Sequence, residues 1–293
     1  MTVVPGTRDV LAVSGADAVT FLQGQVSADV ERLGAGESTW AFLLQPTGKL
    51  GFWLRLTRQD DRVLVDVDAG LGERVAARLR RFLLRVDAAV ELLDWDSATL
   101  VGDDGVVGQE GKVAADALGG ALVLPRERPT PHGPRCVVVD VVGPAGSLTL
   151  PDDLGTATDL VDALVPEAWP SAAEMVEDSI PAELGQWVVD QSVSFTKGCY
   201  TGQELVARVD SRSAETPFRL RVAVADPSGP TISPGDRVEY LGEDRGVVTS
   251  VGTIGAGPVS APGALVRVHR SVPDGAGVLL GATSADLVPG DAS

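Results

Sequence analysis

The ten residues Phe195–Glu204 constrain the fold more than any other stretch, because two glycines and a helix-capping spacing fall within one tight turn. Gly198 and Gly202 permit backbone angles that other residues avoid. Thr201 and Glu204 have the spacing of a capping box, in which the hydroxyl and the carboxylate satisfy orphan amides at a helix start. The stretch therefore predicts a sharp corner followed by a short helix.

The corner has a candidate nucleophile. Ser192–Thr196 alternates apolar and polar residues and predicts a short strand, and Gln203 to about Val209 predicts the helix. Cys199 then lies just before a helix N-terminus and two residues from Lys197, and both features favour a negative charge. The thiol is therefore expected to be reactive, although a corner whose Cys is only a small packed group is the alternative.

Composition limits the function classes. The 293 residues suggest two or three domains, and the net charge of −17 argues against nucleic-acid binding through the overall field, so any RNA contact needs a local basic patch. No apolar run has membrane length, and Met1–Val10 lacks a signal pattern, so a cytoplasmic location is expected. Cys136 and Cys199 lie far apart, and His132 and His269 are isolated. Neither a disulfide framework nor a metal site is expected.

The first ninety residues read as strands with two helices. After a short helix that carries Val19, Phe21 and Leu22 inward, the polar run Gln23–Asp29 is either a solvated turn or a set of hydrogen-bonding groups aimed at a polar ligand. The predicted strands are Asp9–Val13, Trp40–Leu44, Leu50–Thr57, Arg62–Val67 and Val86–Leu93.

Leu71–Leu84 has the clearest helical pattern in the chain. Its apolar face consists of Val75, Leu79, Phe82 and Leu83. A basic stripe about 60° wide consists of Arg74, Arg78, Arg81 and Arg85. The stripe is either a solvated face with ion pairs or a cradle for an anionic ligand, RNA or a protein.

The remaining chain predicts a small α+β unit followed by a β-barrel. The middle has strand-like runs at 98–101, 121–124 and 136–142 and helix-like runs at 113–118 and 157–165. Cys136 opens an apolar strand and is interpreted as packing. A helix is predicted from Pro170 to about Asp178. Glu177 lies in its last turn, where a carboxylate opposes the helix dipole, so it is either an exposed residue without a role or a ligand contact. Barrel strands are expected at Leu220–Val224, Arg237–Tyr240, Gly246–Ile254 and Ala264–His269.

Lys197-Gly198-Cys199-Tyr200-Thr201-Gly202-Gln203-Glu204 resembles the signature of the YgfZ-type folate-binding proteins, which are relatives of the glycine-cleavage T-protein, an aminomethyltransferase. Further stretches are similar to the family's N-terminal half, namely Gly15–Ala18, Phe21–Val26, Asp29–Val30, Thr47–Lys49 and Arg80–Val90. Together these matches cover most of residues 8–90 and 170–212.

The resemblance implies an α+β fold, a three-domain T-protein-like ring around a central tetrahydrofolate pocket with a C-terminal β-barrel. The implied domains are a folate-binding domain in two parts (1–93 and 167–213), an inserted α+β domain (94–166) and the barrel (214–293).

It also implies a tetrahydrofolate-binding accessory protein that assembles or repairs iron–sulfur clusters in client enzymes, including ones that modify tRNA. Its reactive residues would be Cys199, on which that role depends, and Lys197. Its folate contacts would be Glu177, against the pterin, with Gln23, Gln25, Asp29, Tyr200, Gln203 and Arg208. The implied partners are folate and iron–sulfur enzymes, with no membrane and no nucleic acid apart from a local contact through Arg74, Arg78, Arg81 and Arg85.

Several positions depart from the family pattern. The T-protein carries an acidic pair after its hairpin glycine, and aligned from Gly48 those positions are Phe52 and Trp53, which cannot transfer protons. This argues against the alternative function, folate-dependent aminomethyl transfer. Near Glu177 and after the motif, Met175, Ser179 and Ser213 also replace the usual residues.

Overall fold

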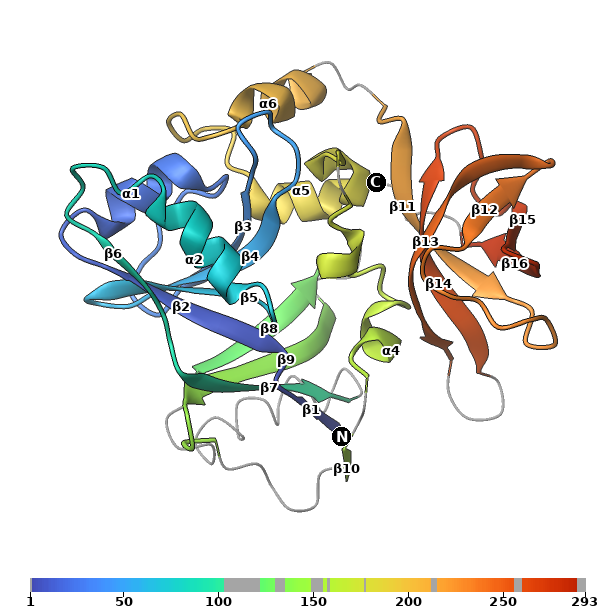
Figure 1. Ribbon diagram of the computed structural model, residues 1–293, viewed down its shortest axis with the longest axis horizontal. Coiled ribbons are helices and arrows are strands. Elements are labelled where there is room, and N and C mark those ends of the chain that lie inside the picture. Colours follow the sequence, from blue (N-terminus) through green and yellow to red (C-terminus); the bar gives the residue numbers. More distant parts are fainter. Residues whose placement is uncertain are drawn as a thin grey trace. The chain divides into compact units, whose positions relative to one another are not determined.

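The computed structural model describes residues 2–102, 122–129, 135–148, 155–156, 159–176, 178–211, 215–255 and 260–288. The chain divides into two compact units (Figure 1). Unit 1 comprises Met1–Leu160 and Asp190–Leu205, and unit 2 comprises Val161–Val189 and Val206–Ser293. The predicted helix at 113–118 lies outside the described residues, and the division into four domain segments stays a prediction.

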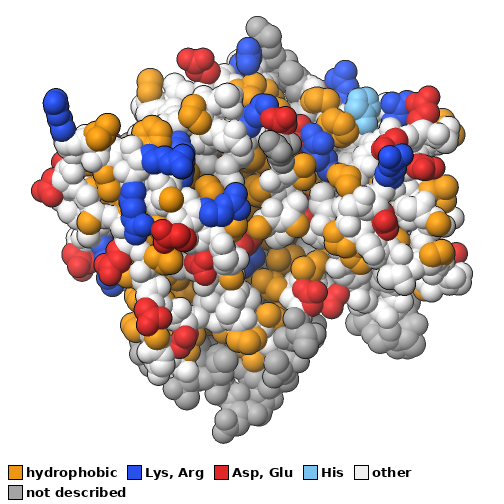
Figure 2. Space-filling model, viewed as in Figure 1, with side chains coloured by type: hydrophobic (Ala, Val, Ile, Leu, Met, Phe, Trp, Pro, Cys, Tyr) orange, Lys and Arg blue, Asp and Glu red, His pale blue; other side chains and the backbone are white. Residues whose placement is uncertain are grey.

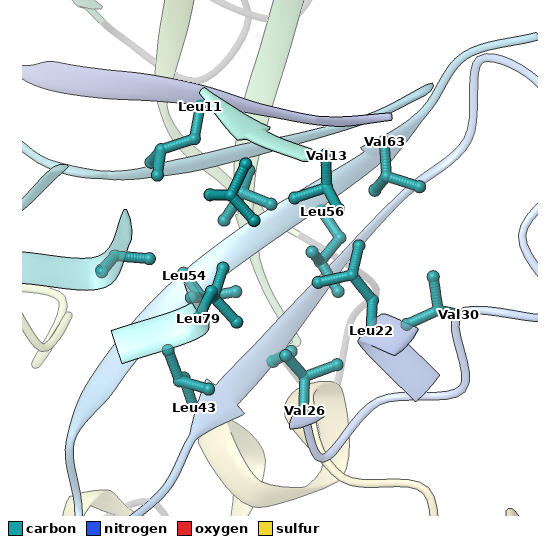
Figure 3. Close-up of a cluster of buried hydrophobic side chains, with 14 of the residues drawn as sticks. Leu11, Val13, Leu22, Val26, Val30, Leu43, Leu54, Leu56, Val63 and Leu79 are labelled. Atoms are coloured by element: carbon teal, nitrogen blue, oxygen red, sulfur yellow. The ribbon is translucent and has the colours of Figure 1, made fainter. Parts of the chain in front are cut away.

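Unit 1 contains two five-stranded sheets, and helices cover one face of the first. Its order is β3-β4-β5-β2-β6, with antiparallel neighbours throughout. Its elements are β2 (Arg8–Ser14), α1 (Ala18–Gln25), β3 (Ser38–Leu43), β4 (Phe52–Arg58), β5 (Arg62–Asp68), α2 (Gly72–Arg80) and β6 (Ala89–Leu92). Alternate strand residues face the same side. Leu11 and Val13 of β2 therefore meet Leu22 of α1 and Leu79 of α2 in one buried cluster (Figure 3).

The other face of this sheet packs on the second sheet, whose order is β10-β1-β7-β9-β8. Its strands are β1 (Thr2–Pro5), β7 (Trp95–Val101), β8 (Leu122–Arg128), β9 (Arg135–Pro144) and β10 (Gly155–Thr156). Val10 and Ala12 of β2 point this way and contact Leu124 of β8 and Val142 of β9. Strand β2 is thus buried on both faces.

Charged residues also lie between the two sheets, in a cluster that we call the inter-sheet network, and all of its members except the partly exposed Asp68 are buried. It consists of Arg8, Arg55, Arg126, Asp66, Asp68 and Asp140. Arg55 pairs with Asp66 and reaches across to Asp140 at 2.9 Å. Arg126 binds both oxygens of Asp140, at 2.9 and 3.0 Å. Burial alone would raise the pKa of Asp140, but Arg126 and Arg55 outweigh it and hold that pKa well below its usual range.

Unit 2 contains a closed barrel of order β11-β14-β13-β12-β15-β16. Its strands are β11 (Phe218–Ala225), β12 (Arg237–Tyr240), β13 (Glu243–Ile254), β14 (Ala261–His269), β15 (Gly277–Leu280) and β16 (Thr283–Leu287). The short helix α4 (Val161–Leu164) leads to Val165, which packs on Leu220 and Leu265 of the barrel strands. The predicted barrel is confirmed, and β15 and β16 were missed.

The predicted helix Leu71–Leu84 extends four residues too far at its C-terminal end. Helix α2 ends at Arg80, and Arg81 keeps helical angles as its cap. Arg85 has a φ of 58°, in the left-handed region, so it leaves the helical surface. The basic stripe therefore consists of Arg74, Arg78 and Arg81 rather than four arginines.

Two further local predictions are wrong, and a tertiary hydrogen bond explains the first. In place of a helix from Pro170 to Asp178 there is one 3₁₀ turn, Ala172–Glu174. The Glu174 carboxylate accepts from the Ser250 hydroxyl of β13 at 2.6 Å, which anchors this turn on the barrel. In place of a strand from Ser192 to Thr196, helix α5 (Gln186–Ser192) ends and a loop follows.

Candidate functional site

The motif Lys197–Glu204 packs against two other stretches of unit 1, the end of α1 and the hairpin Gln45–Gly48. We call this set of contacts the motif junction. The Thr201 amide donates to the Gly24 carbonyl at 3.1 Å. The family resemblance had singled out all three stretches separately, and the fold brings them together.

Lys197 is the central cation of the motif junction. Its ammonium donates to the carbonyls of Gln23, Val26 and Ala28 at 2.6–2.7 Å, which occupies its three N–H groups. Burial lowers the pKa of Lys197 to about 8, and the charges of Asp29 and Glu31 oppose that shift. Lys197 thus ties the motif to the chain that leaves α1.

Gly202 and Gly48 allow the motif and the hairpin to approach closely. A Cβ on Gly202 would lie 2.5 Å from the Gln45 carbonyl oxygen and 3.1 Å from the Gly48 Cα. Both glycines have positive φ, 83° and 81°. Glycine is therefore required at both positions by conformation and by space.

The capping contact differs from the predicted one. The Thr201 hydroxyl turns to the Gly24 carbonyl at 3.5 Å. The reciprocal contact comes from Gln203, whose side-chain oxygen accepts from the Tyr200 amide at 2.9 Å. This is half of a capping box, one residue earlier than expected. The helix itself, α6 (Gln203–Ser211), is confirmed.

Cys199 is a free, exposed cysteine between the two glycines of the motif. Its neighbours on either side of the turn are held, because Lys197 is bound by three carbonyls and Tyr200 by Gln203. The Lys197 ammonium also lies 5.1 Å from the centre of the Tyr200 ring. Burial raises the pKa of Tyr200 to about 12, so its phenol stays neutral at physiological pH. An exposed thiol thus sits on a well-anchored turn.

Four of the predicted folate contacts bond within the protein, and three of them, Gln23, Asp29 and Gln203, lie in the loop after α1 or at the start of α6. The Gln23 amide donates to Asp29 at 3.0 Å, and its oxygen accepts from the Val30 amide at 2.8 Å. Asp29 also pairs with Arg32 at 3.2 Å. Gln203 caps the Tyr200 amide as described above. These side chains shape the loop after α1 and the start of α6.

The other predicted site residues are spread more widely. Gln25 accepts from Arg78 of α2 at 3.5 Å. Arg208 is exposed on α6, and Glu177 lies outside the described residues. In the part of the chain that the structure describes, no group of three or more His, Cys, Asp or Glu side chains is placed to hold a metal ion. Nor does any described helix have the length and apolarity to cross a membrane.

Phe52 and Trp53 are both buried and lie on opposite faces of β4. Phe52 belongs to the buried cluster under α1 and α2. Trp53 stacks on Trp40 at 4.3 Å, and its indole N–H donates to the Ser192 hydroxyl at 2.8 Å. Neither position offers a proton-transfer group.

Sequence reasoning missed Ser27, which connects three segments of unit 1. Its hydroxyl donates to the Ser192 carbonyl at 2.5 Å and accepts from the Phe42 amide at 2.7 Å. Its carbonyl accepts from the Ser194 amide. The available signal was a small polar residue between two apolar ones, Val26 and Ala28. Both neighbours are buried, so Ser27 is buried with them and its hydroxyl needs hydrogen-bond partners.

Comparisons with known proteins agree with the motif. No family model matches the chain. The chain is similar to an uncharacterized protein of Haemophilus influenzae, 27% identical over 206 residues, which cover 70% of this chain and 66% of that protein. It is 28% identical over 223 residues to the tRNA-modifying protein YgfZ of an Enterobacter species, with 69% and 65% coverage. It is also 28% identical over 221 residues to the tRNA-modifying protein YgfZ of Yersinia pseudotuberculosis, and the match covers 70% of this chain and 65% of that protein.

The chain therefore spans just under two thirds of the length of these curated relatives. Among solved structures, the glycine cleavage system aminomethyltransferase T from Bartonella henselae matches with a TM-score of 0.73 and 20% identity, over 99% of this chain and 85% of that one. The resemblance to YgfZ-type proteins and the T-protein-like α+β fold are thus confirmed.

Proposed function

We propose that this protein binds tetrahydrofolate and serves as an accessory protein for the assembly or repair of iron–sulfur clusters in client enzymes, with Cys199 as its reactive thiol. The motif junction carries the proposal. Its cation and its two close-packed glycines hold the turn that exposes Cys199. The similarity to proteins named YgfZ and the T-protein-like fold support the folate part.

The described residues fit two roles in folate binding. Gln23, Asp29 and Gln203 bond to the protein itself, so in this proposal they organise the loop. Tyr200 and the exposed Arg208 remain for direct contact, with Glu177 proposed for the pterin. Tetrahydrofolate, when bound, supplies a carrier for one-carbon groups.

Aminomethyl transfer is the competing function, and the surroundings of Phe52 and Trp53 argue against it. A transferase that uses an acidic pair needs groups that can exchange protons with the substrate. Here one aromatic ring packs under α2 and the other stacks on a tryptophan. Purified protein incubated with tetrahydrofolate and methylamine-type substrates should show no turnover, and measurable turnover would favour the transferase.

Folate binding is tested by thermal melting with and without tetrahydrofolate. Ligand at about one hundred times its dissociation constant should add roughly 2.7 kcal/mol to the free energy of unfolding. Glu177→Ala should weaken binding about tenfold or more, because a polar partner of the pterin is lost, typically about 1–3 kcal/mol. An unchanged melting temperature at saturating tetrahydrofolate would refute the folate part.

The thiol is tested by Cys199→Ser, which keeps size and hydrogen bonding but removes the soft nucleophile. This variant should fold and bind tetrahydrofolate normally, yet fail to restore iron–sulfur enzyme activity in cells that lack the native protein. Alkylation should be faster at Cys199 than at Cys136, which lies on β9, and Cys136→Ser is the matched control. Full complementation by Cys199→Ser would show that the thiol is only part of a turn.

A further inference from the structure

Helix α2 presents an arginine patch that the folate proposal does not use. We define this patch as Arg74, Arg78, Arg81 and Phe82. Arg74 and Arg81 are exposed, and Phe82 is 39% exposed. Figure 2 shows Lys and Arg side chains grouped over α2, with hydrophobic side chains between them.

The patch has no acidic counterpart among the described residues. No described carboxylate lies within 4.0 Å of Arg74, Arg78 or Arg81, and Glu73 on the same helix pairs with Arg80 instead, at 3.2 Å. The chain has 41 acidic residues against 24 basic ones, so an uncompensated basic group is unexpected. The hydrogen bonds of the half-buried Arg78 to described residues go to neutral acceptors, the Gln25 side-chain oxygen and the Leu44 carbonyl, at 3.5 and 3.3 Å.

Aromatic rings accompany the cations. The Arg78 guanidinium lies 4.2 Å from the centre of the Phe82 ring, and the Arg74 guanidinium lies 5.4 Å from the centre of the Phe52 ring. The arginines follow one another at helical i, i+4 and i+7 positions, about 5–6 Å apart per step. The patch is therefore a short row of planar cations with an exposed aromatic ring at its end.

The row adjoins the motif junction. Arg78 contacts Gln25 and Leu44, while Thr201 bonds to Gly24 and a Cβ on Gly202 would touch Gln45 and Leu44. At the end of α1, the Arg78 and Thr201 partners, Gln25 and Gly24, are adjacent residues. At the hairpin, Arg78 and Gly202 both meet Leu44, and Gly202 also meets Gln45. A ligand on the patch would consequently lie beside the turn that carries Cys199.

We infer that the arginine patch binds a short segment of single-stranded RNA, with the arginines on successive phosphates and Phe82 stacking on a base. Guanidinium forks match phosphate geometry, and a basic row interleaved with an aromatic ring is how proteins bind single strands. An acidic protein segment would satisfy the charges but would leave without a stacking partner the part of the Phe82 ring that Arg78 does not cover and that is exposed. This site is independent of tetrahydrofolate.

The test measures fluorescence anisotropy of a fluorescein-labelled twelve-nucleotide oligouridylate RNA between 50 and 200 mM salt. Because about three phosphates are neutralised, the logarithm of the binding constant should fall with the logarithm of salt with a slope of about −2. The triple variant Arg74→Gln, Arg78→Gln, Arg81→Gln should lose most of the affinity and most of the slope. Phe82→Leu, which keeps bulk but removes the ring face, should weaken binding about fivefold or more.

A matched control removes the same charge elsewhere. The triple variant Arg237→Gln, Arg245→Gln, Arg270→Gln changes barrel-unit arginines that have surface pairs and should bind the RNA as the wild type does. Equal loss in both triple variants would overturn the proposal, because net charge alone would then explain binding. Unchanged binding in the α2 variant, or preferential competition by a twelve-residue oligoglutamate peptide, would overturn it too.

Discussion

The inter-sheet network and the motif junction both hold cations away from water, but they compensate the charge differently. In the inter-sheet network, Arg55 and Arg126 face the carboxylate of Asp140 at 2.9–3.0 Å. In the motif junction, Lys197 donates its hydrogen bonds to backbone carbonyls, and the charges of Asp29 and Glu31 also act on it. Carbonyl dipoles satisfy the hydrogen bonds of an ammonium without cancelling its charge.

This difference separates a structural device from a candidate functional one. A closed set of paired ions fixes how two sheets pack, and removing one member leaves a buried charge without its partner. An ammonium on carbonyls fixes a loop and leaves a positive charge beside it. That charge lies in the same turn as the exposed Cys199.

Asp140→Asn should produce the largest loss of stability in this comparison. The substitution keeps the shape but leaves the buried Arg55 and Arg126 without their shared carboxylate, which costs about 3–5 kcal/mol. Urea denaturation of the whole protein measures this loss. Because Arg126 and Arg55 lower the pKa of Asp140, its contribution is present at neutral pH, and the difference from wild type should shrink as the pH falls below about 4.

Glu73→Gln is the matched control for Asp140→Asn. Glu73 pairs with Arg80 on the surface, with both side chains largely exposed, so its loss should cost no more than about 1 kcal/mol. If Asp140→Asn were as mild as this control, the inter-sheet network would not depend on its charges.

Gly202→Ala should destabilise the motif junction by about 2 kcal/mol or more. The new Cβ would lie 2.5 Å from the Gln45 carbonyl oxygen, and the residue has a positive φ. The steric clash and the backbone strain therefore both lower the free energy of unfolding. Gly198→Ala in the same motif is the control, since a Cβ there meets nothing within 4 Å. Denaturation midpoints of the two variants measure the contrast. Equal midpoints would mean that the hairpin moves aside freely.

Lys197→Met should cost roughly 1–2 kcal/mol, because it keeps an apolar stem but leaves three carbonyls without their donor. The effect should be local. Hydrogen exchange of the Thr201 amide, which bonds to Gly24, should speed up more than exchange in the strands of the first sheet. Uniform acceleration throughout unit 1 would instead make Lys197 a general stabiliser.

The sequence predicted best the elements whose signals are local. The barrel strands were found because short apolar runs alternate with Gly and Pro turns, and the helix after the motif was found from its start signals. The family motifs located the three stretches of the motif junction but not their contacts. The chemical activity expected of Lys197 stays a prediction, and its hydrogen bonds show an anchoring contact that the sequence did not reveal.

The inter-sheet network could not be read from the sequence, because its members come from distant strands. Arg55 and Asp140 are 85 residues apart. One signal was nevertheless present: Asp140 interrupts the apolar run Val138–Val142, and a charged residue inside a fully buried strand requires a partner. The wrong helix at Pro170–Asp178 has the same origin, since the Ser250 contact of Glu174 lies outside any local pattern.

The smallest predicted effect is a pH dependence that distinguishes the two kinds of cation site. Burial lowers the pKa of Lys197 from 10.5 to about 8, against the opposing charges of Asp29 and Glu31. Between these two values the unfolded chain retains a proton that the folded chain has released, so the contribution of Lys197 to stability rises with pH across that window. The free energy of unfolding of the wild type minus that of Lys197→Met should accordingly be constant below about pH 7 and increase from pH 8 to 10. Urea denaturation at unit steps of pH measures this difference. A flat difference across the window would mean that the three carbonyls keep the ammonium charged in the folded chain, and the motif junction would then hold its positive charge as firmly as the inter-sheet network does.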